Sequence, residues 1–386
     1  MTHISEDDLK HKDINWVGTW GTSIQPVEES NMPPAPGLSN NTLRQIVRVS
    51  LGGNQLRIKF SNEYGNSDLT INSAHLAVSA GRGSIKPETD GVVTFEGKRS
   101  ITIPAGKTVT SDIIHYCLPK LTDMAITIYF GSMPSALTGH PGSRTTSYLM
   151  SGNGVDSISM PTAVPTEHWY VIAGIDVVAD TPCKSIVALG DSITDGRGST
   201  TDMQNRWTDN LARRLQENTH TAGVGVLNQG IGGNTVLSGG LGPNAVDRFE
   251  RDVLLQSGVC YLIIFEGVND IGLRNSIDAA WDLIKVYKEF ISKAHANNIL
   301  VYGATILPFG GSQYDSSVNE QTRQTVNHWI RTSGEFDAVI DFDEALRDND
   351  EPTRLQSIYD SGDHLHPNAE AYKRLAEIVD LNLFTR

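Results

Sequence analysis

The sequence has few cysteines and no long apolar run, and each absence excludes a class of protein. Its three cysteines, Cys117, Cys183 and Cys260, lie far apart and form no Cys-x-x-Cys pair. Neither a disulfide framework nor a zinc site of that type is therefore expected. The longest apolar runs, such as residues 261–265, fall far short of the roughly 20 residues that span a membrane. We interpret Cys260, which opens the predicted buried strand, as a small hydrophobic residue.

Positive charge is also scarce. The chain has 31 Lys and Arg residues against 45 Asp and Glu residues, which gives a net charge of −14. An acidic surface repels phosphate groups, so neither nucleic acid nor an anionic membrane is expected as a partner. Residues 1–16 are polar and acidic and contain no apolar segment typical of a signal peptide. We expect a cytoplasmic protein, or a secreted one if a leader has been removed. The oligomeric state stays unknown.

The length predicts two domains. A chain of 386 residues with 39% hydrophobic residues is longer than one typical domain core. Residues 1–14 are charged and without periodicity, which predicts a flexible tail. Residues 15–180 show a pattern of strands, and residues 183–386 show alternating strands and helices.

The first domain is predicted to be all-β. Residues 45–51 and 55–60 flank a Gly-Gly-Asn connection, and the second run alternates apolar and charged side chains. This pattern is typical of a hairpin with one buried face. No long helical period appears, so we predict a β-sandwich of jelly-roll type. Further strands are expected over residues 69–78, 91–95, 100–103, 124–130 and 170–178.

The second domain is predicted to be α/β. Strands that alternate with helices indicate a parallel sheet with helices on both faces, and such sheets form their sites at the carboxyl ends of the strands. Trp207 and Trp281 lie on apolar helix faces and are expected in the core. The strands are expected over residues 185–189, 224–227, 261–265, 299–304 and 338–340. The helices are expected around residues 207–215, 246–255, 277–291, 318–330 and 372–378.

Four short polar segments lie at or after these strand ends and near the last helix. They are Gly-Asp-Ser at 190–192, Asn-Gln-Gly-Ile-Gly-Gly at 228–233, Gly-Val-Asn-Asp at 267–270 and Asp-His-Leu-His-Pro at 363–367. Together they supply what acyl transfer needs. Ser192 offers a nucleophile, His366 a general base and Asp363 a carboxylate that orients the base. Gly233 and Asn269 offer N–H donors for an oxyanion.

Each segment also has a plainer interpretation. Asp191 or Ser192 alone can cap the following helix. Gly233 alone can serve a left-handed turn. Asp270 is expected to fix loop geometry. His364 is the alternative base, but its neighbour Asp363 would direct its side chain elsewhere, so we favour His366.

On these four segments, residues 183–386 resemble an SGNH hydrolase of the GDSL esterase/lipase class. One departure is Ile193, where the eponymous motif has leucine. The resemblance implies a flavodoxin-like three-layer α/β/α domain and a carboxylic ester hydrolase that needs no metal and no organic cofactor. It also implies a triad of Ser192, Asp363 and His366, with Ser192, Gly233 and Asn269 forming the oxyanion hole. The chain has no Gly-x-Ser-x-Gly elbow, which argues against an α/β-hydrolase.

The opening Trp-Val-Gly-Thr-Trp at residues 16–20 is similar to the module that precedes the catalytic domain in some SGNH esterases, including carbohydrate deacetylases. We therefore expect a small-molecule or glycan ester as substrate, most plausibly a short-chain, acetyl ester. Arg144 and Tyr148, in the polar loop 142–148, are the proposed substrate contacts. A solvated loop is the alternative for this segment.

Three other functions remain open. One is a lipase or arylesterase acting on longer acyl or aryl esters. Another is a metal-dependent phosphoesterase that uses Asp191, Asp270, Asp363 and His366, although the sequence has no dense set of further His and Asp ligands. The last is a carbohydrate-binding protein with an inactive SGNH domain.

Overall fold

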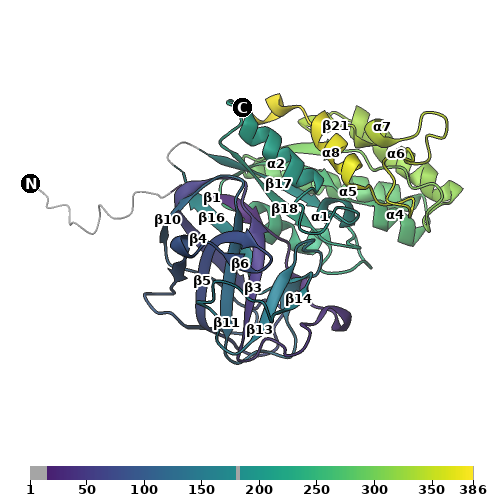
Figure 1. The fold of residues 1–386 in the computed structure, drawn as a ribbon. Coiled ribbons are helices and arrows are strands. Elements are labelled where there is room, and N and C mark those ends of the chain that lie inside the picture. The colour runs from purple at the N-terminus through teal and green to yellow at the C-terminus, as the bar shows by residue number, and fades with distance from the viewer. Residues whose placement is uncertain (1–14, 180–182, 386) are drawn as a thin grey trace, which may run out of the picture.

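The computed structural model describes residues 15–179 and 183–385 (Figure 1). The predicted tail, residues 1–14, and residues 180–182 at the predicted domain boundary lie outside the described residues. Between Val17 and Val178 the structure consists mainly of antiparallel strands, and strands alternate with helices from Lys184 onward. We refer to these parts as the β half and the α/β half; the exact domain limits stay a prediction.

The β half is built from two large antiparallel sheets and one small sheet. The two large sheets enclose a common apolar core that includes Leu43, Ile58 and Phe130. Among the described residues, one large sheet contains β1 (Val17–Gly21), β16 (Ile172–Val178), β4 (Gly53–Ser61), β10 (Ile114–Leu118) and β9 (Thr108–Thr110). The other contains β14 (Val164–Thr166), β13 (Ser147–Ser151), β3 (Asn41–Arg48), β11 (Asp123–Phe130), β5 (Leu69–Gly81), β6 (Ser84–Ile85), β7 (Gly91–Val93) and β8 (Ile101–Ile103). The small sheet contains β15 (Trp169–Tyr170), β12 (Thr138–His140) and β2 (Gln25–Pro26). Jelly-roll connectivity stays a prediction.

The prediction of a hairpin around residues 52–54 is wrong. Strands β3 and β4 lie in different sheets, so the segment between them crosses from one sheet to the other. Thr19 holds this crossing, because its hydroxyl oxygen lies 2.8 Å from both the backbone nitrogen and the carbonyl oxygen of Leu51. A Cβ on Gly52 would come within 2.5 Å of the Leu118 carbonyl oxygen, which explains the glycine. A Gly-rich connection has the same local pattern in a hairpin and in a crossing, and only distant partners distinguish the two.

The α/β half contains a fully parallel sheet, which confirms the predicted fold class. Its strands are ordered β18 (Val224–Gly230), β17 (Lys184–Gly190), β19 (Val259–Phe265), β20 (Leu300–Ala304) and β21 (Ala338–Ile340). Numbered within this half, that order is 2-1-3-4-5, the flavodoxin-like order. The first strand, β17, therefore lies inside the sheet between β18 and β19, and the segment that follows it lies at the topological switch point.

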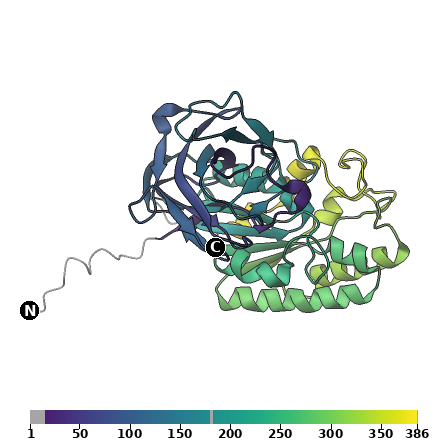
Figure 2. The ribbon, with the colours of Figure 1, turned by 90° about the horizontal axis from the view of Figure 1, so that it is seen from below.

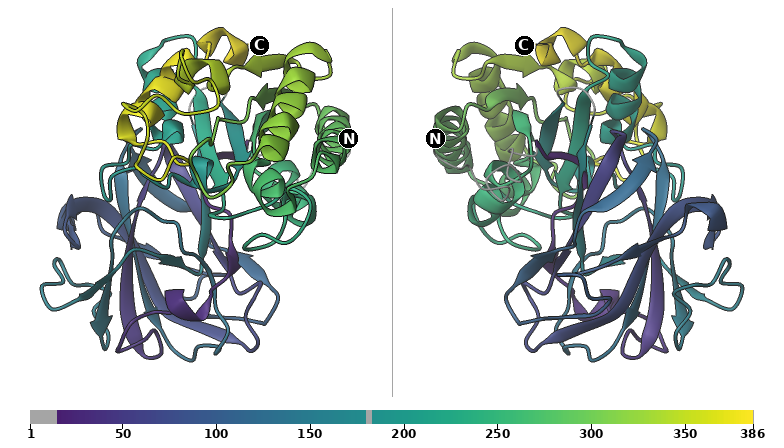
Figure 3. Two further views of the ribbon diagram at one scale, coloured as in Figure 1. Left: turned by 90° about the vertical axis from the view of Figure 1, so that its right-hand side faces the viewer. Right: turned by 90° about the vertical axis from the view of Figure 1, so that its left-hand side faces the viewer.

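Helices cover both faces of this sheet (Figure 3). On one side α2 (Trp207–Glu217) packs against α8 (Ala369–Ile378), and on the other α5 (Asp278–Ala296) packs against α6 (Ser317–Thr332). The shorter helices are α1 (Ser192–Asp195), α3 (Ala245–Phe249) with a π-helical continuation over Glu250–Leu254, α4 (Val268–Arg274) and α7 (Phe342–Leu346).

One of the two tryptophan predictions is confirmed. Trp207 is fully buried, whereas Trp281 is 60% exposed. The apolar stripe of α5 runs through Ala280, Leu283 and Tyr287, one position away from Trp281, so this side chain points off the stripe. No helix in the described ranges combines the length and the apolar character needed to cross a bilayer.

The two halves lie against each other (Figure 2), and glycines at their contact allow close packing. A Cβ on Gly18 in β1 would lie 2.7 Å from the Leu227 side chain in β18, and one on Gly225 would lie 2.8 Å from the Gly18 carbonyl oxygen. The hydroxyl of Ser50 accepts a hydrogen bond of 3.0 Å from the Val226 N–H. The β half thus covers β18, the edge strand of the parallel sheet, which would otherwise expose unpaired backbone groups.

Candidate active site

Ser192 lies at the turn between strand β17 and helix α1. Asp191 is the N-cap of that helix and accepts a hydrogen bond of 2.9 Å from the Ile193 N–H. The cap leaves the neighbouring Ser192 hydroxyl free for another partner. Gly190 is required here, because a Cβ would lie 2.2 Å from the Thr194 hydroxyl and 2.5 Å from the Phe265 carbonyl oxygen. Asp191 therefore caps helix α1, while the next residue of the same turn, Ser192, presents its hydroxyl.

Ser192, His366 and Asp363 form one hydrogen-bonded chain. The Ser192 hydroxyl lies 2.8 Å from His366 Nε2, and His366 Nδ1 lies 2.6 Å from Asp363 Oδ2. Asp363 Oδ1 also accepts the backbone N–H groups of Leu365 and His366 at 3.0 and 2.8 Å. Because these bonds fix the carboxylate within its own turn, the imidazole is held in one orientation with Nε2 toward the serine.

The second histidine of this turn faces elsewhere. His364 has a positive φ of 60° and its Nδ1 lies 2.5 Å from Asp360 Oδ2. Its side chain is 53% exposed. The structure thus joins His366, and not His364, to Ser192.

The surroundings of His366 favour its neutral form. Burial lowers the pKa of His366 below its usual 6.5, although the hydrogen bond and the charge of Asp363 act in the opposite direction. The charges of Arg197 and Arg144 lower this pKa further. Burial also acts to raise the pKa of Asp363, but hydrogen bonds from the backbone and side chain of His366 outweigh it, so that pKa is lowered. The result is an anionic carboxylate beside an imidazole that can accept a proton near neutral pH.

The residues that carry the predicted oxyanion donors, Ser192, Gly233 and Asn269, line one cavity. Gly233 has a φ of 68°, and within the described ranges neither its backbone N–H nor that of Ser192 donates to a protein acceptor. Asn269, in α4, donates one amide hydrogen to the Asn234 carbonyl oxygen at 2.7 Å and accepts the Tyr314 hydroxyl on Oδ1 at 3.0 Å. These two bonds fix which end of the amide is the donor, and they leave its second N–H for a ligand.

The remaining acidic groups of the motifs are engaged by the backbone. Asp270 accepts the N–H groups of Val236 and Leu237, both at 2.8 Å, so it ties the loop after β18 to α4. Burial raises the pKa of Asp270 to about 6 and that of Asp191 well above its usual value. In the part of the chain that the structure describes, no three His, Cys, Asp or Glu side chains are grouped so that they could hold a metal ion.

A buried arginine that the sequence did not single out connects the strand ends. Arg248 donates to the carbonyl oxygens of Gly190 and Gln229 at 3.0 and 2.6 Å and to Asn234 Oδ1 at 3.0 Å. Arg248 thereby holds the strand end before Ser192 in place, and it also fixes Asn234, whose carbonyl oxygen accepts the Asn269 amide hydrogen. Arginine on a short helix is usually solvated, and no sequence pattern marks this one as buried.

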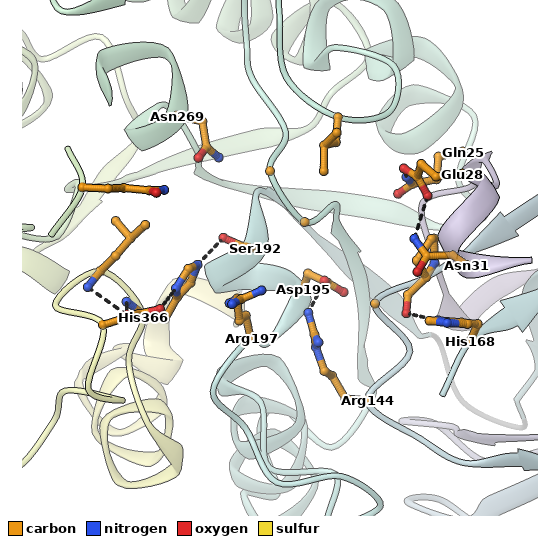
Figure 4. A pocket seen from close by; sticks show the side chains of 18 of the residues that line it. Gln25, Glu28, Asn31, Arg144, His168, Ser192, Asp195, Arg197, Asn269 and His366 are labelled. Atoms are coloured by element: carbon orange, nitrogen blue, oxygen red, sulfur yellow. Dashed lines mark hydrogen bonds and ion pairs between the residues drawn. The ribbon is translucent and has the colours of Figure 1, made fainter. Parts of the chain in front are cut away.

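Ser192, Gly233, Asn269, Asp363 and His366 line a cavity of about 680 Å³ that both halves of the chain enclose (Figure 4). The α/β half contributes Ser192, Asp195, Arg197, Gly232, Gly233, Leu241, Asn269, Gln313, Tyr314, Asp363, Leu365 and His366. The β half contributes Gln25, Glu28, Asn31, Pro141, Gly142, Arg144 and His168.

Of the two substrate contacts predicted in the β half, the structure brings only Arg144 to the cavity. Arg144 donates to Asp195 Oδ2 at 2.9 Å, and His140 Nε2 lies 2.9 Å from Asp195 Oδ1. Asp195 is buried at the end of α1, so these bonds attach the β half to the helix that carries Ser192. Tyr148 does not line the cavity; its ring packs against Gly83, where a Cβ would lie 2.9 Å away.

The chain was compared with protein families, curated proteins and solved structures. Residues 188–374 match the model of the GDSL-like lipase/acylhydrolase family. A search of curated proteins found no match. A G-D-S-L family protein from Desulfitobacterium hafniense DCB-2 is 26% identical with a TM-score of 0.40, over 50% of this chain and 97% of the other. An acetylxylan esterase from Geobacillus stearothermophilus is 19% identical with a TM-score of 0.39, over 50% and 91%. The aryl esterase of M. smegmatis is 16% identical with a TM-score of 0.39, over 50% and 95%.

The region from residue 188 to residue 374 belongs to the GDSL-like lipase/acylhydrolase family. The protein is accordingly a carboxylic ester hydrolase.

Proposed function

We propose that the protein hydrolyses short-chain esters, acetyl esters above all, of polar alcohols such as carbohydrates, with Ser192 as nucleophile. The observation that carries this proposal is the hydrogen-bonded chain from Ser192 through His366 to Asp363, which opens into a cavity beside unpaired N–H donors. A nucleophile, a base and an orienting carboxylate in this order are the components of covalent acyl transfer.

The proposed reaction has two half-reactions. His366 Nε2 takes the Ser192 proton while the oxygen attacks the ester carbonyl carbon. The backbone N–H groups of Ser192 and Gly233 and the free amide hydrogen of Asn269 stabilise the tetrahedral oxyanion; removing one such donor costs about 10²–10³ in kcat in a well-studied protease. His366 then protonates the leaving alcohol. In the second half-reaction, water gives a proton to His366 and attacks the acyl-enzyme carbonyl carbon. His366 then returns this proton to the Ser192 oxygen as the bond to the acyl group breaks and the carboxylic acid leaves.

The lining of the cavity supports a short acyl group and a polar alcohol. Its large apolar members are few, namely Pro141, Leu241, Tyr314 and Leu365. Each methylene of a longer acyl chain would gain about 0.8 kcal/mol only if it were buried against an apolar wall. A lining rich in amides and charges offers no such wall along most of its extent. A lipase acting on long chains is therefore the less favoured alternative.

A metal-dependent phosphoesterase is disfavoured by the hydrogen bonding of its proposed ligands. The carboxylates of Asp191 and Asp270 accept backbone N–H groups, and Asp363 accepts both N–H groups and the His366 ring. These carboxylates are engaged in hydrogen bonds within the protein, which competes with binding a metal ion. The Ser192 hydroxyl is therefore favoured as the reactive group.

The proposal is tested with p-nitrophenyl acetate, butyrate, octanoate and palmitate, alongside acetylated xylan. We expect kcat/KM to be highest for the acetate and to fall as the chain lengthens. A maximum at octanoate or longer would contradict the short-chain assignment and indicate a lipase.

A further inference from the structure

The β half forms the wall of the cavity that faces the reacting groups. Figure 4 shows Glu28 on the side of the cavity opposite His366. Its neighbours there are Gln25 in β2, Asn31 in a 3₁₀ turn (Glu29–Asn31), and His168 just before β15. Ser192 would bond to the acyl carbon, and a short acyl group ends close to that carbon. The alcohol part is therefore the part of such an ester that can reach this distant wall.

The polar groups of this wall are oriented by hydrogen bonds to one another. Gln25 Nε2 donates to Glu28 Oε1 at 2.8 Å, and Asn31 Nδ2 donates to Glu28 Oε2 at 2.9 Å. Only the NH₂ end of an amide can donate to a carboxylate, so the carbonyl oxygens of Gln25 and Asn31 are left for a ligand. Each Glu28 oxygen also keeps capacity for a further hydrogen bond.

His168 completes the same pattern. Its Nδ1 lies 2.7 Å from the Pro141 carbonyl oxygen. A carbonyl oxygen only accepts, so Nδ1 carries the hydrogen, and Nε2 of the neutral ring is an acceptor. The groups that this wall offers a ligand are thus mainly acceptors: two amide oxygens, a carboxylate and a ring nitrogen. A ligand that satisfies them must bring several donors.

The charges around the cavity restrict which donors fit. Glu28, Asp195 and Asp363 line it together with two guanidinium groups, Arg144 and Arg197. The carboxylates would attract an ammonium group, but the guanidinium groups would repel it. An anionic group would be attracted by the guanidinium groups and repelled by the carboxylates. A neutral molecule with several hydroxyl groups provides donors without either penalty.

We propose that Gln25, Glu28, Asn31 and His168 form a subsite that binds the alcohol part of the ester through several free hydroxyl groups, so that the preferred substrate is a partially acylated neutral sugar or polyol. The proposal rests on the esterase function proposed above. It predicts that the β half determines substrate choice while the α/β half carries out the reaction.

The test compares three acetate substrates. A monoacetylated methyl glycoside keeps its hydroxyl donors, the peracetylated form of the same glycoside has none, and p-nitrophenyl acetate has none. The variants are Glu28→Ala, Glu28→Gln, which keeps one acceptor oxygen, and Glu29→Ala as the matched control. Glu29 is an exposed neighbour of equal charge that does not line the cavity.

For Glu28→Ala we expect kcat/KM on the monoacetate to fall about tenfold or more, because the substrate loses hydrogen bonds to a charged group. On the two substrates without hydroxyl donors we expect a change of less than about twofold. On the monoacetate, Glu28→Gln should be intermediate and Glu29→Ala should behave like wild type.

Equal losses on all three substrates, or no loss on the monoacetate, would overturn the subsite. A wild-type enzyme active on p-nitrophenyl acetate but not on the monoacetate would overturn it too, while the esterase function would stand. Wild type inactive on all three would instead refute the esterase function together with the subsite.

Discussion

The two halves of this chain differ in how directly their sequences determine their contributions to the cavity. In the α/β half each strand is followed by its own helix, so the carboxyl ends of the strands meet at one edge of the sheet. In the β half the strands pair with partners far away in the chain: β1 pairs with β16, and β3 with β11 and β13. Local patterns therefore locate polar groups in the first case and leave them undetermined in the second.

The same contrast appears in the chemistry. All of the groups proposed to react or to hold the oxyanion come from the α/β half. The β half supplies the opposite wall and the pair His140 and Arg144 that holds Asp195 on helix α1. Catalysis and recognition are thus assigned to different parts of the chain, and this division can be tested from each side.

The largest effect is expected from replacing the base in the α/β half. His366→Ala should reduce kcat/KM on p-nitrophenyl acetate by about 10⁴-fold or more, because the nucleophile loses its proton acceptor. Asp363→Asn should approach the same loss, since it removes the acceptor that selects the His366 tautomer. Steady-state kinetics on the purified variants measure both.

His364→Ala is the matched control for this pair. It removes an imidazole from the same turn, and its side chain contacts Asp360 and not Ser192. Activity near wild type is expected. A loss from His364→Ala comparable to that from His366→Ala would show that the base had been assigned to the wrong residue.

A smaller effect is expected in the pH dependence. The acid limb of kcat/KM reports protonation of the free enzyme's base, and burial lowers the pKa of His366, so we expect this limb below pH 6.5. Arg197 also lowers this pKa, so Arg197→Gln should raise it and move the limb to higher pH. Arg374→Gln, an exposed arginine on α8 whose pair is with Glu377, is the control. A limb that stays in place or moves to lower pH with Arg197→Gln would show that Arg197 does not act on the base.

Sequence reasoning located the strands of the α/β half because the apolar runs and helical periods there are local, although β18 continues to Gly230, beyond the predicted end at residue 227. The predicted strand over residues 338–340 coincides with β21 (Ala338–Ile340). It also selected the members of the hydrogen-bonded chain, since Asp363 and His366 are three residues apart and need no distant partner to meet. The catalytic roles of these residues stay a prediction until activity is measured.

Groups defined by distant contacts could not be predicted. Tyr314 fixes the Asn269 amide from 45 positions away in the chain. Arg248 resembles a solvated helix residue until the strand-end carbonyls are placed around it. Tyr148 lies close to Arg144 in sequence, yet a strand turns it toward Gly83 and away from the cavity. In each case the decisive information is a contact and not a pattern.

The most direct test of the central claim is the covalent labelling of Ser192 by a serine-directed phosphonate, mapped by peptide mass spectrometry with activity followed in parallel. We predict one phosphonylated residue, Ser192, stoichiometric with the loss of esterase activity. Ser192→Ala should be unlabelled and inactive, with a melting temperature close to wild type. Labelling at another residue, or full activity retained in Ser192→Ala, would contradict the account.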